Sequence, residues 1–106
     1  VNDFIFTVSE EGFLIVIDSK SGKIIRSTDL FDKFKIKKRK KIKPTGFVLG
    51  SKKLYLSTST GRLLIVDIET GKTQSIIKID SEKISRPIIL KQSLFVVKNN
   101  SVIKLN

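Results

Sequence analysis

Short runs of four or five apolar residues recur along the chain, separated by polar turns. The run at residues 13–17 has five successive apolar positions, and similar runs stand at residues 63–66 and 94–97. β-Branched and aromatic residues are frequent in these runs, which favours strands over helices. A strand with one solvated face should alternate between apolar and polar residues, whereas an unbroken run predicts burial on both faces. We therefore expect small sheets that are each packed between neighbours.

The runs belong to a segment that the chain repeats. Residues 4–23 recur 49 positions later, and a weaker third copy follows 40 positions after the second. The first two copies share the turn Asp-x-x-[Ser/Thr]-Gly-Lys, which contains Asp18 and Gly22 in one copy and Asp67 and Gly71 in the other. The aspartate can accept hydrogen bonds from backbone amides of the turn, and the glycine can adopt a positive φ. We therefore interpret these four residues as structural.

The repeat predicts an all-β fold. The expected strands cover residues 4–9, 13–18, 23–29, 45–49, 53–58, 63–66, 72–79, 87–90, 94–97 and 102–106. Units of about four antiparallel strands, repeated every forty-odd residues, are typical of β-propeller blades, with a β-sandwich as the structural alternative. Only residues 30–43 could hold a turn or two of helix, because Pro44 would end it.

The expected organisation is an incomplete propeller of about two and a half to three blades. Blade one covers residues 1–29, a basic insertion covers 30–43, blade two covers 44–79 and a partial blade three covers 86–106. Propellers close with about four to eight blades, so we expect the chain to be a fragment of a larger propeller. Such a fragment would expose apolar end faces and edge strands, which predicts self-association.

Composition excludes several kinds of chemistry. The chain of 106 residues contains no cysteine and no histidine, which removes thiol nucleophiles, imidazole bases and the metal ligands of both types. The two Gly-Lys pairs lack the earlier glycine of a phosphate loop, and the dense acidic spacing of a calcium loop is missing. The sequence therefore predicts no catalytic residue, no metal site and no bound cofactor.

The formal net charge of +11 is concentrated in one segment. Eight of the eleven residues from 33 to 43 are basic, which leaves 13 basic against 10 acidic groups, or +3, elsewhere. They are Lys33, Lys35, Lys37, Lys38, Arg39, Lys40, Lys41 and Lys43. Such a run predicts either a solvated mobile loop or a contact loop for an acidic protein or another anionic surface. Nucleic acid ranks behind these, because Phe34 and Phe47 flank the run without forming a series of stacking aromatics.

The strand at residues 53–58 followed by residues 61–72 resembles the pyrroloquinoline-quinone-type (PQQ-like) propeller repeat. That repeat occurs in quinoprotein dehydrogenases and in non-enzymatic propellers such as the lipoproteins of outer-membrane assembly. The resemblance implies a non-catalytic scaffold that binds other proteins, in the periplasm or at the outer membrane. Fragments of a quinoprotein-like propeller enzyme and of a protein that binds nucleic acid or an anionic surface stay open as alternatives. The repeat also implies a tryptophan two or three residues after Gly-Lys, where the first copy has Ile25 and Arg26.

Overall fold

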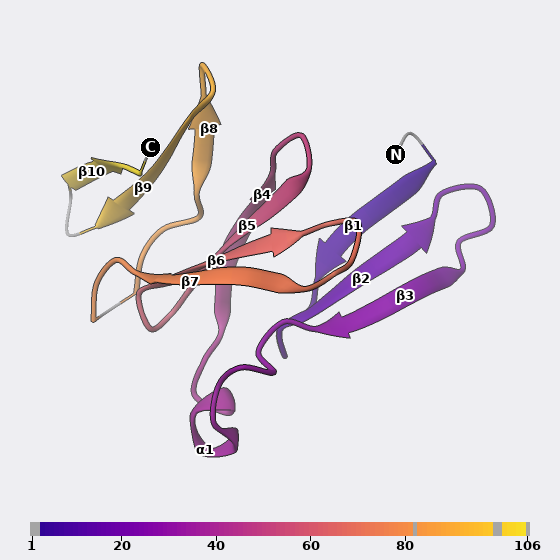
Figure 1. The fold of residues 1–106 in the computed structure, drawn as a ribbon, viewed down its shortest axis with the longest axis horizontal. Coiled ribbons are helices and arrows are strands. Elements are labelled where there is room, and N and C mark those ends of the chain that lie inside the picture. The colour runs from indigo at the N-terminus through magenta and orange to yellow at the C-terminus, as the bar shows by residue number, and fades with distance from the viewer. Residues whose placement is uncertain (1–2, 82, 99–100, 106) are drawn as a thin grey trace.

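The computed structural model describes residues 3–81, 83–98 and 101–105, and these form ten strands and one short helix (Figure 1). In chain order they are β1 Phe4–Val8, β2 Phe13–Asp18, β3 Ile24–Asp29, α1 Ile36–Arg39, β4 Pro44–Leu49, β5 Lys53–Thr58, β6 Arg62–Asp67, β7 Thr73–Lys78, β8 Ile88–Leu90, β9 Ser93–Lys98 and β10 Ser101–Lys104. Each expected strand is present to within two residues at either end, and the helical turn also forms. The last residue of the expected strand 102–106 lies outside the described residues.

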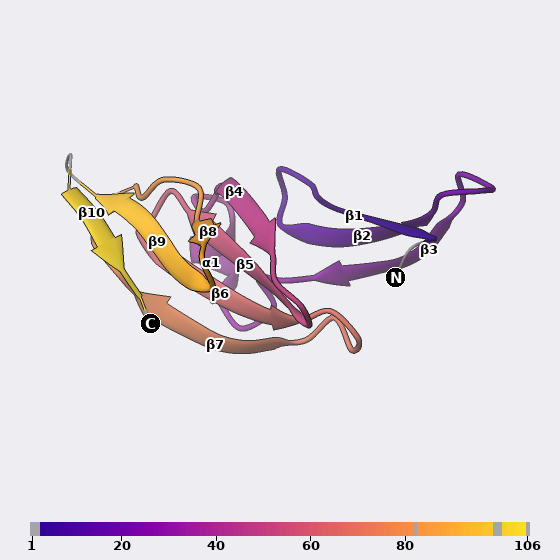
Figure 2. The same ribbon diagram turned by 90° about the horizontal axis from the view of Figure 1, so that it is seen from above.

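The strands form three antiparallel sheets. The first sheet has the order β1-β2-β3, the central sheet β4-β5-β6-β7 and the third sheet β10-β9-β8. The central sheet lies between the other two, and the whole measures 42 × 38 × 20 Å (Figure 2). Across the described residues, no helix has the length and apolar character needed to cross a membrane.

Two equivalent turns join β2 to β3 and β6 to β7. In each turn the aspartate carboxylate accepts the backbone N–H of the second residue after it, at 2.9 Å for Asp18 and 2.8 Å for Asp67. The amides of Gly22 and Gly71 each donate to the carbonyl of the same aspartate at 2.8 Å. Their φ angles are +73° and +76°, a conformation that glycine adopts without steric cost. Both aspartates and both glycines therefore have a structural explanation in the turn itself.

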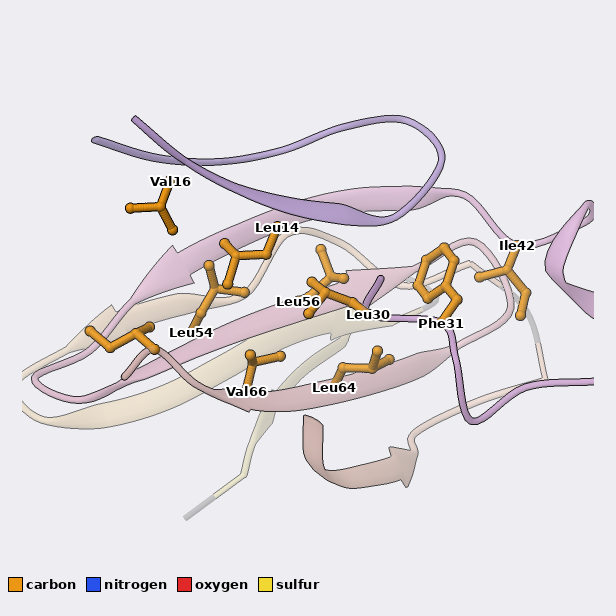
Figure 3. Close-up of a cluster of buried hydrophobic side chains, with 10 residues drawn as sticks. Leu14, Val16, Leu30, Phe31, Ile42, Leu54, Leu56, Leu64 and Val66 are labelled. Carbon is orange, nitrogen blue, oxygen red and sulfur yellow. The ribbon is translucent and has the colours of Figure 1, made fainter. Parts of the chain in front are cut away.

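The main core lies between the first and central sheets (Figure 3). Leu14 and Val16 of β2 face four residues of β5 and β6 that are fully buried, Leu54, Leu56, Leu64 and Val66. Alternation along each strand selects these positions, since residues two apart share a face. Burying a side chain of this size contributes about 1.5 to 3 kcal/mol, so this one contact accounts for much of the stability.

The opposite face of the central sheet lies toward the third sheet. Leu63, next to Leu64 on β6, is also fully buried, so this strand is covered on both faces as its unbroken apolar run predicts. The hydroxyl of Thr45 donates to the carbonyl of Ile84 at 2.9 Å and joins β4 to the segment that precedes β8. On the end sheets the outward face stays partly open, as expected for the apolar end faces of an incomplete propeller: Phe13 and Val97 are each 37% exposed.

Arg26 fastens the first sheet to the central sheet. Its Nη1 donates to the carbonyl of Glu69 at 2.7 Å and its Nη2 to that of Ile68 at 2.6 Å, both in the turn between β6 and β7. The neighbouring Gly71 packs so closely that a Cβ there would lie 2.8 Å from Thr28 Oγ1. The chain thus uses an arginine where the resemblance implied a docking tryptophan.

Candidate interaction site: the basic insertion

The connection between β3 and β4, residues 30–43, is here called the basic insertion. Three of its apolar residues belong to the main core: Leu30 is 0%, Phe31 1% and Ile42 4% exposed (Figure 3). They stand near its two ends, while the basic residues occupy the middle. The insertion is therefore attached to the core at both ends, a feature that the sequence did not predict.

Phe31 is the largest fully buried side chain of the insertion. Its ring meets the edge of the Phe34 ring, with centroids 5.7 Å apart and planes at 79°. It also covers Gly12, where an added Cβ would lie 2.3 Å from the Phe31 ring and where φ is +89°. The backbone N–H of Phe31 donates to the Asp29 carboxylate at 2.9 Å. Glycine at position 12 therefore makes room for Phe31, the second residue of the insertion.

Arg39 makes hydrogen bonds to the start of the insertion. Its Nη1 donates to Asp29 Oδ2 at 3.1 Å, its Nη2 to the carbonyl of Asp32 at 2.8 Å and its Nε to the carbonyl of Phe34 at 3.1 Å. A planar guanidinium offers donors on three separate nitrogens in a fixed geometry, whereas the three donors of a lysine share one nitrogen. Arg39 thus holds the last turn of α1 against the start of the insertion.

The ends of the insertion are also bonded to the central sheet. Lys33 Nζ donates to the carbonyl of Thr73 at 2.7 Å, and Thr73 Oγ1 donates to the carbonyl of Leu30 at 3.3 Å. At the other end, the backbone N–H of Lys43 donates to Ser59 Oγ at 3.0 Å, and the Ser59 N–H donates to the Lys43 carbonyl at 2.8 Å. Lys33 is therefore a structural residue rather than a free surface charge.

Seven of the eight basic residues are exposed, and six of these lysines are not bonded to the fold as Lys33 is. Among the described residues, none of these six ammonium groups has a hydrogen-bond or ion-pair partner: Lys35, Lys37, Lys38, Lys40, Lys41 and Lys43. Ile36 lies within this group and is 76% exposed, the largest value among the described large hydrophobic residues. Ile36 is thus an exposed apolar residue flanked in the sequence by exposed lysines, and this segment can contact an acidic surface that offers an apolar recess.

Sequence reasoning found the cations but missed their support. Leu30, Phe31 and Ile42 are too widely spaced to form a periodic run, and the neighbouring charges conceal them. A usable signal exists in the pair Leu30-Phe31, two large apolar residues that directly follow a predicted strand. The roles of Lys33 and Arg39 depend on acceptors in folded segments and carry no local signal.

A pocket also lies between the first and central sheets. It is an apolar pocket of about 320 Å³ lined by Phe4, Phe6, Val16, Ile25, Arg26, Ile68 and Glu69. Its one cationic side chain, Arg26, already donates to two carbonyls of the central sheet. Within the part of the chain that the structure describes, no three acidic side chains lie close enough together to hold a metal ion. The pocket lacks a set of converging polar groups, so the basic insertion is the stronger candidate site.

Comparison with known proteins resolves the fold. No protein-family model matches the chain, and no curated protein matches it. Among solved structures, BamB from Moraxella catarrhalis superposes with a TM-score of 0.67 at 13% identity, over 96% of this chain and 29% of that one. The β-propeller domain of Myceliophteria thermophila Cps50 (Swd1) gives 0.56 at 17% identity, over 92% and 46%. The fold is that of a β-propeller.

The predicted fold class is therefore confirmed, and the β-sandwich alternative is set aside. The three antiparallel sheets of this chain correspond to part of a propeller, since the chain spans less than half the length of the BamB chain and of the Swd1 chain. Likeness at this level of identity concerns the fold alone, because one fold serves many functions.

Proposed function

We propose that this chain is a non-catalytic β-propeller segment that binds an acidic partner protein through the basic insertion. The observation that carries the proposal is the contrast within the insertion. Lys33 and Arg39 are bonded to the fold, and Phe31 is buried in it, whereas the six lysines between and after them have no partner among the residues that the structure describes. A fixed cationic surface loses little conformational entropy on binding, in contrast to a mobile loop.

Ile36 favours a protein as the partner. Protein interfaces combine a central apolar contact with a polar rim, and the exposed Ile36 surrounded by lysines has this arrangement. Stacking of nucleic-acid bases is poorly supported, because Phe34 and Phe47 pack against the main core. An acidic protein surface with an apolar recess satisfies both chemical features of the insertion.

The finer part of the proposal is that the partner belongs to cell-envelope assembly. Its support is the resemblance of residues 61–72 to the PQQ-like repeat, which non-enzymatic propellers of that system also contain. The likeness to BamB concerns the fold and adds no partner. The binding experiment therefore uses chemically defined probes rather than a named protein.

The test measures binding of a short fluorescein-labelled polyglutamate peptide by fluorescence anisotropy over a salt series. The test variant carries Lys→Glu changes at positions 35, 37, 38, 40 and 41. The control variant carries the same number of Lys→Glu changes at exposed positions elsewhere, 20, 23, 52, 83 and 91, so both variants have the same net charge. We expect the test variant to bind at least about tenfold more weakly than the control, with a shallower salt dependence.

Arg39→Lys separates charge from position. The variant keeps the charge but loses the three hydrogen bonds of the Arg39 guanidinium. We therefore expect binding about threefold weaker than wild type, because the lysines are displaced although none is removed. Equal affinity of the test and control variants would refute the insertion as the binding surface. Tighter binding to duplex DNA or to phosphatidylglycerol vesicles than to the peptide would replace the acidic protein with that partner.

A further inference from the structure

The first sheet has an apolar face directed away from the central sheet. The strand register places three isoleucines of this face side by side, since Ile5 lies opposite Ile17 and Ile17 lies opposite Ile24. Ile5 is 50% and Ile24 64% exposed, although residues of this type are usually buried. The residues of this first outer face are Ile5, Phe13, Ile15, Ile17 and Ile24.

The third sheet has a second such face at the other end of the molecule (Figure 2). Here Ile88 lies opposite Phe95, and Val97 lies opposite Val102. Val102 is 70% and Ile88 49% exposed. The residues of this third outer face are Ile88, Leu90, Phe95, Val97 and Val102.

The first outer face corresponds by the repeat to a face that the central sheet buries. A shift of 49 positions places Ile17 on Val66 and Ile24 on Thr73. Val66 is 0% and Thr73 6% exposed, and both lie on the side of the central sheet that packs against the first sheet. The first outer face is therefore the kind of surface that receives a preceding sheet.

The third outer face corresponds to the opposite side of the central sheet. A shift of 40 positions places Val97 on Ser57. The strand partner of Val97 is Val102 and that of Ser57 is Leu63, so Val102 corresponds to Leu63. Ser57 and Leu63 are both 0% exposed on the side toward the third sheet. The third outer face is therefore the kind of surface that packs against a following sheet.

We propose that these two faces bind each other between two copies of this chain. The third outer face of one copy packs on the first outer face of the second, and the reverse contact closes the pair. Each contact repeats the sheet-to-sheet packing that the chain already makes on both sides of its central sheet. Two copies with three sheets each supply six sheets, within the range of about four to eight that closes a propeller. Because the contact joins unlike faces, it is head-to-tail and ends only when the ring closes.

The test is sedimentation equilibrium of the chain, whose monomer mass is 12.0 kDa. Wild type should show twice that mass. Ile24→Asp disables the first outer face and Val102→Asp the third, so each variant alone should sediment as a monomer. An equimolar mixture should again give a dimer, since one undamaged face of each kind is present. Ile36 lies on neither outer face and is 76% exposed, compared with 64% for Ile24, so Ile36→Asp should leave the dimer unchanged.

Other results would overturn the proposal. A dimer of Val102→Asp alone would show that like faces pair, and a series of higher masses would show that the contact does not close. A wild-type monomer at high concentration would leave sheets of a longer chain, or another protein, as the occupants of both faces. Circular dichroism verifies folding of each variant, and Ile24→Ser with Val102→Ser repeats the mixing experiment if aspartate unfolds the chain.

Discussion

Phe31→Ala tests whether the basic insertion is part of the fold. The ring is 1% exposed, lies against Gly12 and meets the edge of Phe34. The bond from the Phe31 amide to Asp29 uses the backbone and survives the change. The variant therefore removes packing alone and leaves the hydrogen bonds and the charges of the insertion in place.

The expected cost follows from the burial. Full burial of such a side chain contributes up to about 3 kcal/mol, and the cavity that it leaves raises the cost of Phe→Ala to about 3 to 5 kcal/mol. Small domains are stable by about 5 to 15 kcal/mol, so Phe31→Ala should remove about a fifth of the stability or more. Phe31→Leu retains most of the apolar volume and should cost only about 1.5 kcal/mol.

Urea unfolding followed by far-ultraviolet circular dichroism measures these differences from the shift of the midpoint. Ile36→Ala is the matched control, because Ile36 is in the same insertion and 76% exposed. Its change in unfolding free energy should stay within about 0.5 kcal/mol. If Phe31→Ala cost less than about 1 kcal/mol, the insertion would not be anchored in the core and the rigid support that we derive for its lysines would be refuted. If Phe31→Ala does not fold, Phe31→Leu still gives the comparison with Ile36→Ala.

Two further predictions concern the contact between the first and central sheets. Gly71→Ala should destabilise the chain by at least about 1 kcal/mol more than Gly22→Ala. Both glycines have a positive φ, but only Gly71 lies against Thr28. Equal urea midpoints of the two variants would refute the close approach of Gly71 to Thr28. Arg26→Leu should lower the free energy of unfolding by about 1 to 3 kcal/mol, because two hydrogen bonds are lost. Arg26→Lys should recover little of this stability, because one ammonium group cannot replace the guanidinium fork. Full recovery in Arg26→Lys would show that charge alone matters.

Local patterns predicted most of the fold. β-Branched runs marked the strands, and the shared Asp-x-x-[Ser/Thr]-Gly-Lys turn fixed the period, because turn geometry demands particular residues at particular places. The burial of Leu63 and Leu64 on opposite faces of β6 was likewise contained in their unbroken run. The resemblance marks position 26 as a docking position, but nothing local shows that an arginine makes the contact, because its acceptors lie 42 and 43 positions away.

The candidate site was predicted less completely than the fold. A run of like charges is visible in any sequence, but its conformation depends on whether the few apolar residues nearby find partners. Phe31 finds one only because Gly12, in an earlier hairpin, leaves space for its ring. Arg39 binds inward because Asp29 ends β3 within reach of its guanidinium. Such outcomes are set by tertiary packing, which the sequence pattern does not contain.

The two proposals use different parts of the chain, and this makes them independent. Contact between copies uses only positions that recur, since Ile24 and Val102 correspond to buried positions of the central sheet. The basic insertion uses only residues that do not recur, since the connection from the central sheet to the third sheet has no comparable run of lysines. Repeated positions are constrained by packing of one sheet on the next, whereas an inserted segment can change in charge without disturbing that packing. Partner specificity is therefore expected in the insertion and assembly in the outer faces, and failure of either test leaves the other proposal intact.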